Sequence, residues 1–356
     1  MDGTAIVLTL GKLDSPAAKT AHGLVRGSER YKVVGVIDDQ SAGEDAGEVI
    51  DGIHRNIPIY SDLSDYFENT DEIADYCIIG IASAGGKVAP EWIPFIKEAI
   101  QNEMSIVCGM HEFLSENSEI ADLAEKHDVQ IIDVRKPKPR EELHFWTGEI
   151  HKVLVPIIPV LGTDCAVGKR TTARFLVETC QQMGINAQMI YTGQTGWMQG
   201  GKYGFVFDST LNDFVSGELE HAILTCYRET DPDVIFVEGQ AALRNPSGPC
   251  GSELLVSGLA SGVVLIHPPG RKLYKGWEFT GREIPPIENE IALINMYGVE
   301  TLGVAINTQY LTVEQARVWQ KKYQEELNGI PAVLPIQDGV ADLVNAIKDK
   351  FNIQPS

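Results

Sequence analysis

The chain has 356 residues, of which 44% are hydrophobic and 22% are charged, which is enough apolar material for two packed cores and too little charge for wholesale disorder. The formal net charge of −21 argues against a general affinity for nucleic acid or for an anionic membrane, because both carry negative charge themselves. No apolar run approaches the roughly 20 residues that span a bilayer, and no signal-peptide pattern opens the chain. The six cysteines form no CxxC pair, as expected for reduced thiols in a cytoplasmic protein.

The first part of the chain alternates short apolar runs with stretches of helical periodicity, which is typical of a parallel α/β sheet. The apolar runs that we expect to form strands are residues 5–10, 31–37, 74–82, 105–108 and 129–134. The stretches that we expect to form helices between them are residues 16–26, 92–102 and 118–127. Residues 1–135 are therefore predicted to form a Rossmann-like domain.

This domain lacks the GxGxxG turn of dinucleotide-binding proteins, because the turn after its first strand has a single glycine, Gly11. Asp38 ends the second strand, where such proteins carry the acid that binds the ribose of NAD. One matching position favours NAD binding only weakly. The preferred interpretation is a partner domain, which closes over a site in the second half of the chain or builds a homo-oligomer.

A charged segment with two prolines, residues 136–150, breaks the pattern and is the predicted linker. The alternation resumes in residues 151–356. Strands are expected there at residues 153–161, 187–191, 233–237, 262–267, 301–306 and 332–336, and helices at residues 169–183, 213–228, 287–297 and 313–327. We predict an α/β protein in which the Rossmann-like domain is followed by a P-loop NTPase-like parallel-sheet domain.

The second domain opens with an apolar strand, a glycine-rich loop, Gly168-Lys169 and a helix, which is the arrangement that binds phosphate. Backbone N–H groups of such a loop point inward, the helix N-terminus adds a positive partial charge, and the lysine reaches the terminal phosphates. The residues that we expect to bind the cofactor are Gly162, Thr163, Asp164, Cys165, Ala166, Val167, Gly168, Lys169, Arg170, Thr171, Thr172 and Asn307.

The loop departs in two ways from the usual GxxxxGK[ST] pattern. Five residues, not four, separate Gly162 from Gly168, as in the GTDxxVGK loop of dethiobiotin synthetase and its relatives, which this loop resembles. Arg170 follows Lys169, so the first hydroxyl comes one position later, at Thr171. The arginine weakens the case for magnesium and adds a second cation near the phosphates.

Other strand ends of the second domain carry candidate polar groups. Glu238 ends an apolar strand (DVIFVEG) that should lie beside the loop, where it can act as a general base or bind magnesium through water. If magnesium is used, Thr171 and Glu238 are its expected ligands. Asn307 can read an adenine edge or simply form a turn, and His267, at another strand end, has the features of a structural histidine.

The residues after the second strand of this domain (YTGQTGW) are polar and glycine-rich, and they follow the carboxyl end of a strand, where ligands of open α/β sheets bind. They form either a substrate loop or an ordinary glycine turn. For acyl transfer, Gln194 can stabilise an oxyanion beside Glu238 as base, and Arg170 or Arg244 can receive a substrate carboxylate. The residues that we expect to bind substrate are Thr192, Gly193, Thr195, Gly196 and Arg244.

Several motifs along the chain resemble, in the same order, a bacterial family long called a domain of unknown function, which includes D-glutamate N-acetyltransferases of the DgcN type. The motifs are AKTAHGL at 18–24, GIASAGG at 80–86, IIDVRKP at 131–137, GTDCAVGKRT at 162–171, TGQTG at 192–196, VEGQAAL at 237–243 and GVAIN at 303–307. The resemblance covers nearly the whole chain. The stretch 38–52 and the IPIY that follows it depart from the acetyltransferase pattern and resemble a different branch of the family, a departure that bears on the amino-acid substrate more than on the fold.

The resemblance implies transfer of an acetyl group from acetyl-CoA to the amine of an amino acid such as D-glutamate. Coenzyme A carries a diphosphate and a 3′-phosphate, so a P-loop can hold it without hydrolysis. An ATP–Mg²⁺-dependent ligase or kinase of the dethiobiotin synthetase class is the alternative, with Lys169, Thr171 and Glu238 serving the nucleotide. A non-catalytic nucleotide sensor is the third hypothesis, and it would be favoured if Glu238 pointed away from the loop.

Overall fold

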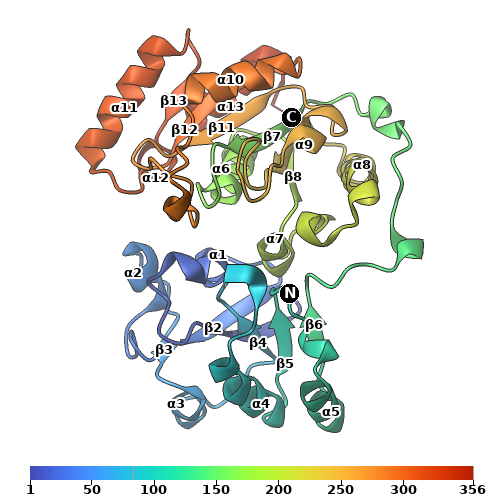
Figure 1. The fold of residues 1–356 in the computed structure, drawn as a ribbon, viewed down its shortest axis with the longest axis vertical. Coiled ribbons are helices and arrows are strands. Elements are labelled where there is room, and N and C mark those ends of the chain that lie inside the picture. The colour runs from blue at the N-terminus through green and yellow to red at the C-terminus, as the bar shows by residue number, and fades with distance from the viewer. Residues whose placement is uncertain (83, 356) are drawn as a thin grey trace. The chain divides into compact units, whose positions relative to one another are not determined.

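The computed structural model describes residues 1–82 and 84–355, so Ser83 of the GIASAGG motif lies outside the described residues. The chain forms two compact units (Figure 1). The first unit contains Met1–Lys138 together with Gln194–Lys202, and the second contains Pro139–Gly193 and Tyr203–Ser356. The sequence pattern predicts one domain over residues 151–356, whereas the structure groups the nine-residue stretch that begins at Gln194 with the first unit.

The first unit is built on a six-stranded sheet in which every described pairing is parallel. Its strands are β1 Gly3–Leu8, β2 Tyr31–Ile37, β3 Ile59–Tyr60, β4 Tyr76–Ile79, β5 Ser105–Cys108 and β6 Ile131–Asp133. Their order in the sheet is β3-β2-β1-β4-β5-β6, which is the order of a doubly wound Rossmann fold. Its helices are α1 Lys19–Arg26, α2 Ala46–Asp51, α3 Leu63–Glu68, α4 Ile93–Gln101, α5 Ser118–Lys126 and α7 Gln194–Met198.

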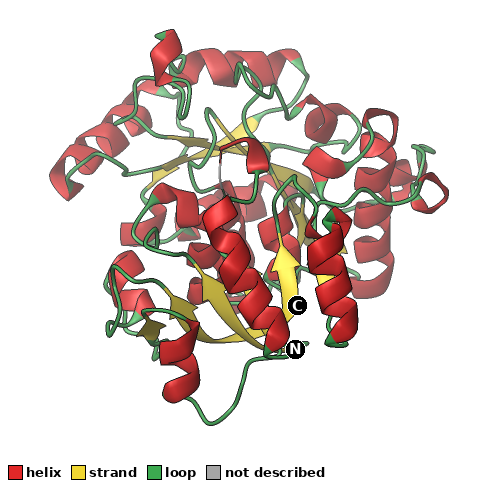
Figure 2. Cartoon of the chain, turned by 60° about the horizontal axis from the view of Figure 1, so that its bottom comes forward, coloured by secondary structure: helices red, strands yellow, loops and turns green. Residues whose placement is uncertain are grey.

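The second unit contains a seven-stranded parallel sheet in the order β13-β12-β11-β7-β10-β8-β9. Its strands are β7 Ile157–Gly162, β8 Ala187–Tyr191, β9 Tyr203–Gly204, β10 Val234–Glu238, β11 Val263–His267, β12 Thr301–Ile306 and β13 Ala332–Val333. Its helices are α6 Lys169–Gln182, α8 Asn212–Thr230, α9 Ser252–Val256, α10 Ile287–Met296, α11 Val313–Glu326, α12 Pro335–Asp338 and α13 Ala341–Phe351. Figure 2 shows helices packed against the sheets.

Alternation along the central strand β7 creates two cores in the second unit. Ile157 and Leu161 pack in one core with α8, α10 and α11, whereas Ile158 and Val160 pack in the other core with α6 and α13. Successive side chains of a strand point to opposite faces, so a strand that is buried on both faces reads as a continuous apolar run. This explains why the sequence pattern located β8, β10, β11 and β12 to within a residue or two, and the carboxyl end of β7 as closely.

The predicted linker is anchored on the second unit by two buried acids of α8. Glu218 accepts a hydrogen bond from the backbone N–H of His144 at 2.8 Å, and Glu220 accepts one from the N–H of Thr147 at 2.6 Å and one from that of Ile150 at 3.1 Å. Both glutamates are only 2% exposed. This segment is therefore fixed by specific backbone contacts.

Several expected elements need correction. The strand predicted at 332–336 ends at Val333, because Pro335 cannot donate a ladder hydrogen bond and instead starts the short helix α12. The strand predicted at 153–161 begins at Ile157, after a 3₁₀ turn at Glu149–Lys152. The sequence pattern did not predict the short elements α2, α3, β3, α7, β9 and α9, nor the 11-residue helix α13.

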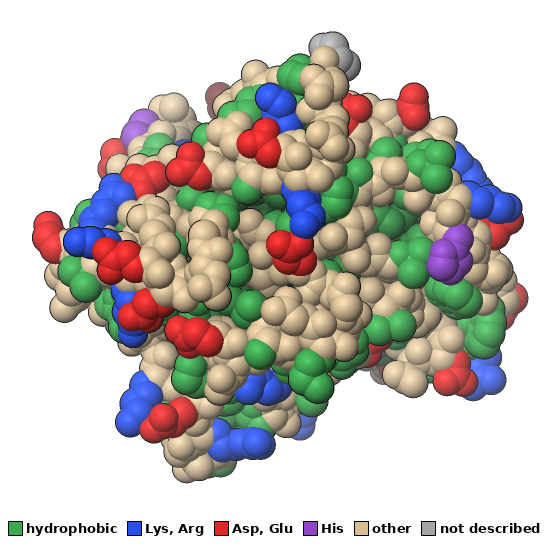
Figure 3. Space-filling model, turned by 90° about the horizontal axis from the view of Figure 1, so that it is seen from above, with side chains coloured by type: hydrophobic (Ala, Val, Ile, Leu, Met, Phe, Trp, Pro, Cys, Tyr) green, Lys and Arg blue, Asp and Glu red, His purple; other side chains and the backbone are tan. Residues whose placement is uncertain are grey.

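The surface charge and the length of the helices indicate which kinds of partner the protein can bind. On the face drawn in Figure 3, acidic and basic side chains are interspersed, so the negative net charge is not gathered into one patch there. No helix among the described residues is long and apolar enough to cross a membrane.

Candidate functional site: the loop after strand β7

The loop between β7 and α6 turns sharply, and two of its positions require glycine for steric or conformational reasons. A side chain at Gly162 would place its Cβ 2.6 Å from a methyl group of Val167, which is too close for real atoms. Gly168 has a φ of +97° and is the N-cap of α6, where it offers no side chain to the first N–H groups of the helix. Ala166 also has a positive φ, of +49°. The first turn of α6 therefore presents uncapped N–H groups, the basis of a phosphate site.

Lys169 folds back over the loop. Its Nζ donates to the backbone oxygen of Asp164 at 2.8 Å and to that of Ala241 at 2.6 Å, and the residue is 8% exposed. Burial lowers the pKa of this ammonium group, so an anionic ligand that restores its charge balance would be favoured. The glycine of the VEG motif makes room for it, because a Cβ at Gly239 would lie 3.1 Å from the Lys169 stem and 2.4 Å from the Val160 oxygen.

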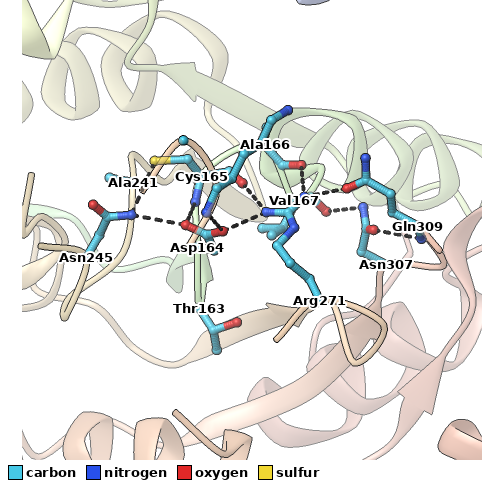
Figure 4. A network of polar contacts seen from close by, with 12 residues as sticks. Thr163, Asp164, Cys165, Ala166, Val167, Ala241, Asn245, Arg271, Asn307 and Gln309 are labelled. Atoms are coloured by element: carbon cyan, nitrogen blue, oxygen red, sulfur yellow. Dashed lines mark hydrogen bonds and ion pairs between the residues drawn. The ribbon is translucent and has the colours of Figure 1, made fainter. Parts of the chain in front are cut away.

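The buried carboxylate of Asp164 holds the loop in shape (Figure 4). Arg271 donates to it at 2.7 Å, the amide of Asn245 at 3.0 Å and the backbone N–H of Lys275 at 2.9 Å. Asp164 is fully buried, and the Arg271 side chain is only 6% exposed. Arg271 also donates to the backbone oxygen of Cys165 at 2.8 Å, so one guanidinium holds both the acid and the loop backbone.

Two strand-end residues that the sequence singled out also touch the loop. The Asn307 amide donates to the backbone oxygen of Val167 at 2.9 Å and accepts from the N–H of Gln309 at 3.0 Å. The hydroxyl of Thr163 lies 2.8 Å from Nδ1 of His267, whose pKa burial lowers to about 4. His267 is therefore a neutral structural partner of the loop, and the Asn307 amide is engaged in holding the backbone.

Glu238 lies beside the loop, as the strand pattern predicted, because β10 pairs with β7. Its carboxylate does not point away from the loop: it receives Nη2 of Arg170 at 3.0 Å. Its Oε2 also accepts the N–H of Thr192 at 3.2 Å, while the Thr192 hydroxyl donates to the Glu238 backbone oxygen at 2.7 Å. Gln240 completes the cluster by donating to that hydroxyl at 2.8 Å. The cluster joins the helix start, β10 and the end of β8.

The predicted substrate loop is divided between the two units. Thr192 and Gly193 belong to the second unit, whereas Gln194, Thr195 and Gly196 begin α7 in the first unit. Gln194 is 5% exposed, and its side-chain oxygen accepts from Arg135 at 2.8 Å. Gln194 and Glu238, which we expect to act in catalysis, thus lie in different units.

Arg244 is paired with an acid that the sequence analysis did not identify. Its guanidinium lies 2.6 Å from the carboxylate of Glu290, a residue of α10 that is only 2% exposed. Burial raises the pKa of Glu290, and Arg244 opposes that shift. A substrate carboxylate at Arg244 would compete with this partner.

In the first unit, Asp38 has no capacity left for a ribose. It is fully buried, and its oxygens accept from the N–H groups of Lys12 and Leu13, both at 3.0 Å, from the Thr9 hydroxyl at 2.7 Å, and from the N–H groups of Gln40 and Ser41. The acid that suggested a dinucleotide site instead fixes the protein's own turn.

The residues that the sequence pattern did not predict are Arg271, Asn245 and Gln309 at the loop, and Glu290 beside Arg244. Arg271 and Asp164 are 107 positions apart, and no local pattern links them. The one available signal is that Asn245, Arg271 and Gln309 follow β10, β11 and β12, whose carboxyl ends meet at the same edge of a parallel sheet as that of β7.

Taken together, the fold and the loop define a P-loop protein with a Rossmann-like N-terminal unit. Comparison with known proteins agrees. Residues 39–137 match a family described as a domain of unknown function (DUF1611_N), Rossmann-like domain, and residues 144–344 match the corresponding DUF1611_C P-loop domain. The chain belongs to the DUF1611 family.

Relatives in this family share most of the chain. A D-glutamate N-acetyltransferase from Pseudoalteromonas sp is 31% identical over 75% of this chain and 79% of its own. A protein of the same name from Tritonibacter scottomollicae is 30% identical over 76% of this chain and 80% of its own. The crystal structure of a DUF1611 family protein from Anabaena variabilis superposes with a TM-score of 0.87 at 27% identity, covering 97% of this chain and 99% of that one.

Proposed function

We propose that this protein is an N-acetyltransferase that moves the acetyl group of acetyl-CoA to the amine of an amino acid such as D-glutamate. The observation that carries the proposal is the 31% identity, over 75% of the chain, to a protein named D-glutamate N-acetyltransferase. The divergent stretch 38–52 forms α2 and its flanking turns in the first unit, and leaves the choice of amino acid to be measured.

The geometry of the second unit supports a phosphate-holding role for the loop. The uncapped start of α6 offers N–H groups, and Lys169 and Arg170 add two side-chain cations. We propose that these groups bind the phosphates of coenzyme A. The thioester of acetyl-CoA supplies the acetyl group, and the long pantetheine arm separates it from the phosphates.

In the reaction, the amine nitrogen forms a bond to the thioester carbonyl carbon and the carbon–sulfur bond breaks. The substrate ammonium must first lose a proton, and the departing thiolate gains one. We propose Glu238 as the base and Gln194 as a donor to the oxyanion. Glu238 is paired with Arg170, so it becomes a free base only when that guanidinium turns to a phosphate. Arg244 is the proposed partner of the substrate carboxylate.

The Arg170–Glu238 pair works against the alternative of an ATP–Mg²⁺-dependent ligase or kinase. In that class the residue after the lysine is a hydroxyl that binds magnesium. Here that position is a guanidinium, and the nearby acid is already neutralised by it.

The test is an acetylation assay with the purified protein. Acetyl-CoA is incubated with D-glutamate or L-glutamate, thiol release is followed by absorbance, and the N-acetyl product is identified by mass spectrometry. We expect product with at least one amino acid and none with K169A. Thiol release that is independent of any amino acid, or none at all across a panel of D- and L-amino acids, would refute the proposal.

A further inference from the structure

The second position of helix α6 carries the feature that separates this loop from its magnesium-dependent counterparts. In those proteins a serine or threonine hydroxyl at this position binds Mg²⁺, together with an acid from a neighbouring strand. Here Arg170 occupies the position, and its Nη2 lies 3.0 Å from Oε2 of Glu238. The two side chains are 13% and 11% exposed. A fixed cation therefore stands where the metal would bridge helix and strand.

The other oxygen ligands at the loop do not replace the missing hydroxyl. Thr171 is one residue further along α6, which turns its side chain about 100° around the helix. The carboxylate of Asp164 is fully occupied by Arg271, Asn245 and backbone N–H groups. Mg²⁺ requires near-octahedral oxygen ligands, and Arg170 would repel it. The residues present do not fit a magnesium ion.

We infer that Arg170 takes the place of the metal, so that the loop binds an adenosine diphosphate ester free of any divalent cation. The guanidinium exchanges the carboxylate of Glu238 for the phosphate oxygens, to which it can donate two parallel hydrogen bonds. Lys169 gives up its two carbonyl partners in the same way. The inference rests on the phosphate-binding role proposed above for the loop, and it does not depend on acetyl transfer.

In this exchange the carboxylate of Glu238 lowers the affinity for the ligand, whereas in a magnesium site it would raise it. When Arg170 moves to the ligand, Glu238 keeps the N–H of Thr192, 3.2 Å away, as a partner. Glu238 thus competes with the ligand for Arg170. In a magnesium site the same acid would help to hold the metal–nucleotide complex. Weakening the acid should therefore strengthen binding here and weaken it in a magnesium site.

The experiment is isothermal titration calorimetry of the full chain with coenzyme A and, separately, with ADP, each in excess EDTA and in millimolar MgCl₂. We expect the Kd of wild type for coenzyme A to agree within about twofold in the two buffers, because Arg170 and not a metal contacts the phosphates. A site that needed the metal would lose a charge-assisted phosphate contact in EDTA, which is worth roughly tenfold or more. A tightening of more than about tenfold on adding magnesium would overturn the inference.

Variants sharpen the result. R170T, which restores a hydroxyl, should lose roughly tenfold in EDTA and regain affinity with magnesium, whereas R170K should stay insensitive to magnesium. E238Q should bind coenzyme A roughly fivefold tighter in EDTA. The matched control is E178Q, an exposed acid on the same helix that pairs with Arg174, and it should leave both Kd values unchanged. Weaker binding by E238Q would contradict the exchange.

Failure of this inference is distinguishable from failure of the proposed function. If coenzyme A does not bind but ADP binds in EDTA, the acetyl-CoA proposal falls and the metal-free site stands. If coenzyme A binds only with magnesium, the acetyl-CoA proposal stands and the metal-free site falls. If neither ligand binds in EDTA, the inference is overturned. Thermal unfolding of each variant, compared with wild type, shows whether a loss of binding comes from misfolding.

Discussion

Each unit begins its sheet with a strand, a turn and a helix. The two turns differ in whether a carboxylate of the protein occupies their backbone N–H groups. After β1, the backbone N–H groups of Lys12 and Leu13 both point at the carboxylate of Asp38, 3.0 Å away. After β7, the acid is Asp164, which lies inside the turn and is bound mainly by Arg271 and Asn245 from other loops.

The helix starts differ in the same sense. In the first unit, the side chain of Ser15 caps the 3₁₀ turn Pro16–Ala18 that leads into α1. In the second unit, Gly168 leaves the first turn of α6 uncapped and Lys169 stands over it. A strand–turn–helix unit can thus bind an anionic ligand when no acceptor of the protein itself occupies the N–H groups of its turn and helix start. In the first unit a protein carboxylate already fills that place.

The largest expected effect on ligand binding comes from removing the cation of the open turn. Lys169→Ala should weaken coenzyme A binding by roughly 100-fold or more, because a charge-assisted contact to phosphate is lost in a buried site. The fold should persist, since the bonds of Nζ within the described part of the chain go to two backbone oxygens and to no side chain. Calorimetric titration measures the Kd, and circular dichroism checks the fold.

The matched control is Lys12→Ala, which removes a lysine from the filled turn of the first unit. Lys12 lies 5.5 Å over the ring of Trp92, and its N–H is already taken by Asp38. Its removal should leave the coenzyme A Kd unchanged. An unchanged Kd in the Lys169 variant, or an equal loss in both variants, would remove the distinction between the two turns.

The second prediction concerns the pair that shapes the open turn. Arg271→Ala should lower the free energy of unfolding of the second unit by about 3–5 kcal/mol, because it leaves the buried carboxylate of Asp164 without its charge partner. Differential scanning calorimetry should show the transition of this unit at a lower temperature. The double variant D164N/R271M should recover part of the loss, and a double variant less stable than R271A would contradict a role for charge pairing.

These two residues also mark the limit of what the sequence could predict. The loop, Lys169 and Glu238 are encoded in contiguous motifs whose strand and helix patterns are strong, and the pairing of β10 with β7 followed from them. The Asp164–Arg271 pair joins positions 107 residues apart, and buried ion pairs leave no periodic trace in a sequence.

The placement of Gln194–Lys202 was equally hidden. Its helix α7 has five residues, too few for a periodic signal, and it contains Gly196. Its position in the first unit is fixed by the amide of Gln199, which donates to the backbone oxygens of Gly23 at 2.6 Å and Gly27 at 2.8 Å. Contacts between a side chain and distant backbone depend on the finished fold, so propensity could not locate them.

The third prediction is a pH dependence centred on His267. Burial lowers its pKa from 6.5 to about 4, so the unfolded chain binds a proton at this residue more readily than the folded chain does. Its contribution to stability is therefore constant above about pH 6.5 and is lost as the pH falls from 6.5 towards 4, by about 3 kcal/mol in total.

Urea unfolding at several pH values measures this slope, and His267→Asn provides the comparison. Asparagine can keep a polar atom near the hydroxyl of Thr163, which lies 2.8 Å from Nδ1, but it does not titrate. The variant should lose less stability than wild type between pH 6.5 and 4. Equal slopes for the two proteins would show that His267 is not the group responsible.

The smallest expected effect tests the filled turn. Asp38→Asn should lower the free energy of unfolding of the first unit by about 1–2 kcal/mol, because an NH₂ group must face N–H donors where a carboxylate oxygen accepted them. Coenzyme A binding should not change. Asp39→Asn is the matched control, since its exposed carboxylate accepts only from the neighbouring Gln40 side chain among the described contacts, and its stability should match wild type. Weaker coenzyme A binding by Asp38→Asn, with unchanged binding by Asp39→Asn, would show that the turn after β1 affects the ligand site. A protein carboxylate bound to the N–H groups of a turn would then not be evidence that the turn binds no ligand.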